Sequence, residues 1–100
     1  MSFDDDKAAA LRGKRARDVL ENEVYSEAHS LIEQEIINRW RAAQSTEERE
    51  RLHLMLGLLG KVKSALESVM STGQAAEKVL EAEKSRLQRL GARFAIGSRS

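Results

Sequence analysis

Apolar residues recur every three or four positions between residues 52 and 90. The series is Leu52, Met55, Leu59, Val62, Leu66, Val69, Gly73, Ala76, Leu80, Glu83, Leu87 and Leu90, in which only Gly73 and Glu83 depart from the apolar pattern. Alternating spacings of three and four place these residues on one side of a helix that packs along another helix. The pattern therefore predicts a long helix whose seam is strongest in its leucine-rich first half.

A second amphipathic helix is predicted from Ala16 to Ala43. Its apolar residues recur at four-residue steps, at Ala16, Leu20, Val24, Ala28, Ile32, Ile36 and Trp40, while glutamates occupy the other faces. This spacing is typical of a helix with one buried side. Trp40 ends the apolar series, so we interpret it as a core or interface residue.

The turn between the two helices is predicted at residues 42–48. Ser45 and Glu48 have the spacing of a capping box, in which hydroxyl and carboxylate each bond a free backbone N–H at a helix start. Because the connection is short, the helices should lie antiparallel. The expected register places Ile36 opposite Leu52 and Leu20 opposite Val69.

The part of the chain after Gly73 leaves two alternatives open. A glycine on the seam marks either a break in the helix or a close approach of two backbones, and we favour a break or local bend. The segment beyond then either continues the second helix, with a stop at Leu90-Gly91, or folds back as a third helical segment. The predicted organisation is an acidic then basic N-terminal segment (1–15), a helical domain (16–91) and a flexible basic tail (92–100).

Composition agrees with an all-α fold. The chain has 100 residues, of which 33% are charged, and it contains no proline and no cysteine. This is the composition of long helices and coiled coils. We therefore predict a long antiparallel helical hairpin, coiled-coil-like, that oligomerises because a core this small needs further support.

The leucine-rich segment also predicts where copies meet. Residues 52–60 are apolar on nearly every side of the helix, and such a helix must be covered all round. The residues expected off the main seam form the predicted oligomer interface, which consists of Leu54, Leu56, Gly57, Leu58 and Gly60. A third helical segment that folds back over this patch is the rival interpretation.

The sequence offers little for catalysis or cofactor binding. Without cysteine there is no thiolate nucleophile, and no glycine-rich phosphate loop follows a strand. Glu50 and His53 have the spacing of di-iron bundle ligands, but the heptad points both away from the first helix. We predict a non-enzymatic protein without metal or cofactor. No apolar run suggests a membrane span or signal peptide, which favours a cytoplasmic location.

Charge suggests one further partner. The formal net charge is only +1, so an interaction with nucleic acid must depend on local clusters. In the antiparallel arrangement the cations near both termini are expected at the same end of the rod. The candidate nucleic-acid-binding residues are Lys7, Arg12, Lys14, Arg15, Arg17, Arg86, Arg89 and Arg93. Such a surface would bind phosphates with salt-sensitive affinity and without reading bases.

Several segments carry a family resemblance. They are RG at 12–13, ARDVLEN at 16–22, IINRWR at 36–41, STEERERLH at 45–53, and LESVMSTGQAA at 66–76. Their order resembles small helical proteins encoded by tailed bacteriophages among head and DNA-packaging genes. The resemblance implies a virion-assembly or genome-packaging component, such as a small-terminase-like ring subunit in the host cytoplasm. The alternatives are a cellular coiled-coil adaptor or regulator that binds a partner helix, and a metal-binding helical dimer.

Overall fold

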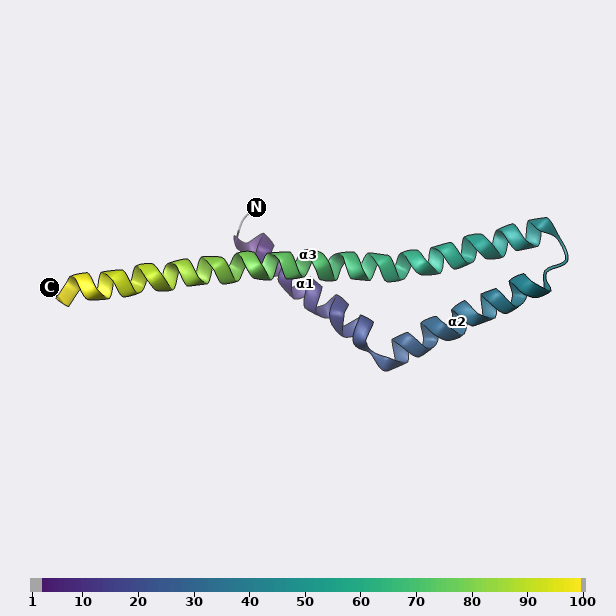
Figure 1. Cartoon of the computed structure of the whole chain (residues 1–100), viewed down its shortest axis with the longest axis horizontal. Coiled ribbons are helices and arrows are strands. Elements are labelled where there is room, and N and C mark those ends of the chain that lie inside the picture. Colours follow the sequence, from purple (N-terminus) through teal and green to yellow (C-terminus); the bar gives the residue numbers. More distant parts are fainter. Residues whose placement is uncertain (1–2, 100) are drawn as a thin grey trace.

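Three helices form an elongated hairpin (Figure 1). The structure, a computed structural model, describes the backbone of residues 3–99 and the side chains of residues 3–92. Helices α1 (Phe3–Glu21) and α2 (Glu23–Ala42) run antiparallel to the much longer α3 (Thr46–Arg99). The molecule measures 84 × 26 × 15 Å. The all-α hairpin fold is confirmed.

The first arm of the hairpin is divided at Asn22, which the sequence prediction missed. Asn22 has extended backbone angles (φ −70°, ψ 124°), and its side chain accepts a hydrogen bond from the Tyr25 N–H at 2.9 Å. Asparagine competes in this way with the helical hydrogen bond and favours a new helix start. The uninterrupted helix predicted from Ala16 is therefore wrong. Helix α1 instead starts at Phe3, so the expected boundary between residues 15 and 16 falls inside it.

The turn lies where the sequence predicts it. Helix α2 ends at Ala42, and the Glu48 N–H at the start of α3 donates to the Ser45 hydroxyl at 3.1 Å. This is the hydroxyl half of the predicted capping box. The guanidinium of Arg49 also donates to the Ala43 carbonyl at 3.1 Å. These bonds fix the connection and support the antiparallel return of the chain.

Gly13 and Gly73 meet where α1 crosses α3. A Cβ atom built on Gly13 would lie 2.6 Å from the Gly73 Cα, and one built on Gly73 would lie 2.5 Å from the Gly13 Cα. Only glycine permits such an approach of two backbones. Helix α3 continues unbroken through Gly73 and past Gly91 to Arg99. The favoured break at Gly73 is therefore wrong, and so is the predicted helix end at Gly91.

The inner side of α3 follows the predicted seam only in part. Leu52 is buried with Ile36 and Ala43, and Leu56 and Leu59 pack against this cluster. Several other predicted seam residues are also buried or half-buried, namely Leu66, Gly73, Ala76 and Leu80. The exposed ones are Met55, Val62, Val69, Leu87 and Leu90. The predicted pairing of Ile36 with Leu52 is confirmed. Leu20, however, lines a pocket with Lys63, while the Val69 carbonyl lies beside Gly13, so the register expected for Leu20 is wrong.

Candidate self-association interface

A continuous stripe of large apolar side chains is exposed on the first half of α3. We call it the α3 stripe, and it consists of Leu54, Met55, Leu58, Val62 and Val69. Leu54 is 67% exposed and Leu58 is 61% exposed. At about 100° per residue, the five side chains fall within roughly 100° of the helix circumference. They form one face, beside the face that packs on α2.

Gly57 and Gly60 are open but lie outside this face, about 60° and 120° from Leu54 around the helix. Both are exposed, and a Cβ atom added to either would meet nothing within 4 Å. Unlike Gly73, they are not required by packing within the chain. Because glycine has no side chain, these two positions would allow a partner helix to approach the α3 backbone closely. Gly57 lies on the side of α3 away from the first arm, whereas Gly60 is only about 40° around the helix from Leu56, which packs on that arm.

The structure divides the predicted oligomer interface. Leu54 and Leu58 lie in the α3 stripe, but Leu56 is half-buried against the cluster of Ile36, Ala43 and Leu52. Leu56 is therefore part of the chain's own packing. The sequence places Met55, Val62 and Val69 on the inner seam because their heptad spacing fits either of two adjacent helix faces.

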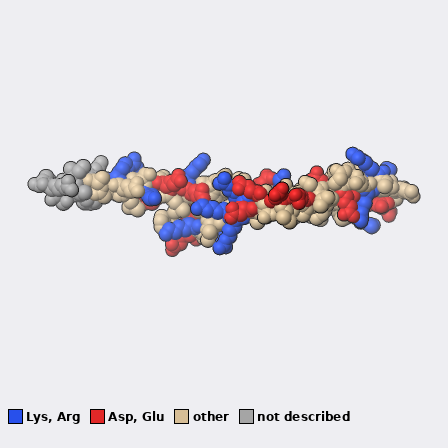
Figure 2. Space-filling view, turned by 90° about the horizontal axis from the view of Figure 1, so that it is seen from below, with Lys and Arg blue, Asp and Glu red and all other residues tan. Residues whose placement is uncertain are grey.

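The candidate nucleic-acid-binding cations do not form one basic end. Because α1 crosses α3 at Gly73, Arg12 lines a shallow pocket with Ser68, Val69 and Thr72. Arg86 lies 13 residues beyond Gly73 on the continuous helix, which is about 20 Å at 1.5 Å per residue. Figure 2 shows basic and acidic side chains interspersed along the visible face. The side chain of Arg93 lies outside the described residues.

Several of these cations already have partners. Lys14 lies 3.8 Å from Glu77, Arg17 lies 3.0 Å from Glu21, and Arg86 pairs with Glu83. The hydrogen bond to Glu21, followed by its charge, raises the pKa of Arg17. Lys7 lies over the Phe3 ring, 4.4 Å from its centroid. Within the described residues, the remaining α1 cations, Arg12 and Arg15, have no ion pair.

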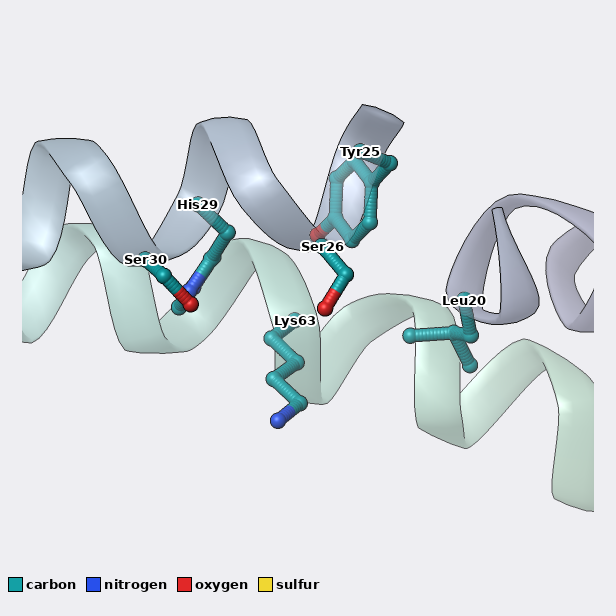
Figure 3. A pocket seen from close by; sticks show the side chains of 6 residues that line it. All are labelled: Leu20, Tyr25, Ser26, His29, Ser30 and Lys63. Atoms are coloured by element: carbon teal, nitrogen blue, oxygen red, sulfur yellow. The ribbon is translucent and has the colours of Figure 1, made fainter. Parts of the chain in front are cut away.

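A small polar pocket lies between the junction of α1 and α2 on one side and the facing part of α3 on the other. It has a volume of about 80 Å³ and is lined by Leu20, Tyr25, Ser26, His29, Ser30 and Lys63. The side chains of Tyr25 and His29 point from α2 towards α3, whereas the Lys63 amine extends away from them (Figure 3). The Tyr25 hydroxyl and His29 Nε2 are buried without a hydrogen-bond partner among the described residues. Ser26 and Ser30 line the same pocket, but no hydrogen bond joins either hydroxyl to His29 Nε2 in the described part of the chain.

Glu50 and His53, which have the spacing of di-iron ligands, lie together near the start of α3. Glu50 and His53 line a shallow groove with Trp40 and Leu54. Among the described residues, no group of three or more His, Cys, Asp or Glu side chains is placed to hold a metal ion. None of the described helical segments combines the length and apolar character needed to cross a membrane.

Comparisons with protein-family models, curated proteins and solved structures gave no match. The fold and the exposed surfaces therefore carry the functional argument.

Proposed function

We propose that this chain is a non-enzymatic subunit of an oligomeric assembly whose copies meet through the α3 stripe. The observation that carries the proposal is the exposure of Leu54 and Leu58, at 67% and 61%, in a row of apolar side chains. The stripe spans 16 residues from Leu54 to Val69, or about 24 Å of helix. Contiguous apolar surface of this kind marks protein interaction sites.

The family resemblance supports a more specific proposal. The segments at 12–22, 36–53 and 66–76 resemble those of tailed-phage head and packaging proteins. We therefore propose a virion-assembly or genome-packaging component, with a small-terminase-like ring subunit as the model. The unpaired cations Arg12 and Arg15 would supply contacts to DNA phosphates, without base recognition.

The free energy of association through the proposed contact can be estimated from the two exposed leucines. Full burial of a leucine side chain contributes about 1.5–3 kcal/mol, so burying the exposed part of Leu54 or Leu58 contributes at least about 1 kcal/mol. In a symmetric dimer each leucine is buried in both copies, so its contribution to the free energy of association counts twice. Replacing both leucines by glutamate should therefore remove about 4 kcal/mol or more, which weakens association about a thousandfold.

The test measures molar mass by light scattering across a concentration series. We expect the wild type to be oligomeric and the Leu54→Glu, Leu58→Glu variant to be a single copy at the same concentration. The matched control is Ser64→Glu with Ser71→Glu, which adds the same charge at exposed positions about 130° and 150° around α3 from the middle of the stripe. The control should retain the wild-type mass.

The outcomes separate the proposal from its rival. An unchanged mass in the leucine variant would show that the α3 stripe is not the contact between copies. A chain that stays a single copy until a partner helix is added would favour the coiled-coil adaptor. Circular dichroism at 222 nm verifies that both variants remain helical.

A further inference from the structure

The C-terminal part of α3 projects beyond the rest of the molecule. Helix α3 extends well past the crossing point with α1, and no other helix accompanies its last turns (Figure 1). Within residues 84–92, which we call the α3 arm, Leu87 and Leu90 are exposed. The arm contains three cations, Lys84, Arg86 and Arg89, and no acidic residue.

The arm is amphipathic. Leu87 and Leu90 are three residues apart and share a face, as i, i+3 pairs do. At about 100° per residue, Lys84 and Arg86 lie on opposite flanks of Leu87, whereas Arg89 lies on the far side of the helix. The arm thus presents an apolar strip flanked by Lys84 and by Arg86, and Arg86 also pairs with Glu83 at the base of the arm.

The outer face of α2 has the complementary character. Val24 and Leu31 are the most exposed of the large apolar residues, at 72% and 71%, and their seven-residue spacing places them on one face. Glu27 and Glu35 lie on the two flanks of Leu31, and Glu35 also pairs with Arg39 on the same helix at 2.8 Å. Residues 18–38 contain six acidic residues and no lysine or arginine.

The two surfaces cannot meet within one chain. Leu56 and Leu59 mark the part of α3 that packs beside α2. Leu87 lies 28 residues beyond Leu59 on the same continuous helix, which is about 42 Å. A contact between arm and α2 must therefore join two copies.

We propose that the α3 arm of one copy docks on the outer face of α2 of a second copy. Leu87 and Leu90 cover Val24 and Leu31, and Lys84 and Arg86 face Glu27 and Glu35. Ala28 lies between Val24 and Leu31, where its small side chain leaves room for a leucine from the arm. Every copy carries one arm and one α2 face, so two joined copies still have one arm and one α2 face unoccupied. The contact therefore repeats from copy to copy. The inference deepens the proposed function and rests on it for the existence of an assembly.

A charge-exchange experiment tests this contact with the full-length chain. Lys84→Glu with Arg86→Glu reverses the arm, and Glu27→Lys with Glu35→Lys reverses the acceptor. Sedimentation at low salt should show that each variant alone needs about tenfold more protein to reach the wild-type average mass. An equimolar mixture of the two should return to within about twofold of the wild type, because every arm then meets an acceptor of opposite charge.

The matched control reverses two cations on the far side of the same helix. Lys78→Glu with Arg89→Glu changes the net charge equally and should leave assembly within about twofold of the wild type. Loss in both single-surface variants with recovery on mixing supports the contact. Equal loss in the control, or no recovery on mixing, overturns it.

The same data distinguish the two proposals. If only the Leu54→Glu, Leu58→Glu variant loses mass, the α3 stripe stands and the arm contact is wrong. If the wild type remains a single copy throughout, both proposals are wrong.

Discussion

Replacing Gly73 with alanine should force α1 away from α3. The new Cβ atom would lie 2.5 Å from the Gly13 Cα and 2.9 Å from the Ala9 carbonyl oxygen. Carbon atoms in favourable contact are about 3.5–4.0 Å apart, so the backbones must separate by roughly 1 Å or more. Both obstructing atoms belong to the backbone of a helix, so no side-chain rotation relieves the collision.

The expected cost combines two opposing contributions. Forcing an extra methyl group into a packed contact costs about 1–3 kcal/mol, with the upper part of this range appropriate to a backbone collision. Alanine favours the helix over glycine by about 1 kcal/mol, which offsets part of that cost. We therefore expect Gly73→Ala to lower the free energy of unfolding by about 1–2 kcal/mol. Gly13→Ala should behave alike, because its Cβ would lie 2.6 Å from the Gly73 Cα.

The assay is urea unfolding followed by circular dichroism at 222 nm, at one dilute protein concentration. Gly60→Ala is the matched control, because it makes the same change in the same helix where a Cβ meets nothing within 4 Å. It should raise the free energy of unfolding by about 0.5–1 kcal/mol. The reasoning is refuted if Gly73→Ala is as stabilising as Gly60→Ala.

Two other predictions concern the pocket and the cations. Tyr25→Phe removes a buried hydroxyl that has no partner among the described residues. The free energy of unfolding, measured in urea, should therefore rise by about 1 kcal/mol. A clear fall would contradict this prediction. If α1 contacts DNA, Arg12→Gln with Arg15→Gln should reduce the slope of log affinity against log salt by about 2. The Lys61→Gln control should leave that slope unchanged, and an equal effect of both variants would exclude α1 as the DNA-binding surface.

Local patterns were sufficient to predict the two helical arms of the hairpin and its turn, but not all the helix boundaries. The spacing of apolar residues and the Ser45 cap involve neighbours within one or two helical turns, so they can be interpreted without the fold. The kink at Asn22 also had a local signal, since asparagine is a favoured N-cap, but the apolar series continues across it and concealed it. The exposure of Leu54 and Leu58 agrees with the surface expected from their place off the seam.

The sequence by itself determined that this chain forms amphipathic helices joined by a short turn, because helix periodicity and capping are local properties. Only the tertiary structure decided that Gly73 pairs with Gly13, since a close approach depends on a partner 60 positions away in the chain. It also decided which apolar positions of α3 face the first arm of the hairpin and which stay exposed. Met55, Val62 and Val69 belong to an apolar surface wider than one partner helix covers, and the placement of α1 and α2 determines which side stays exposed.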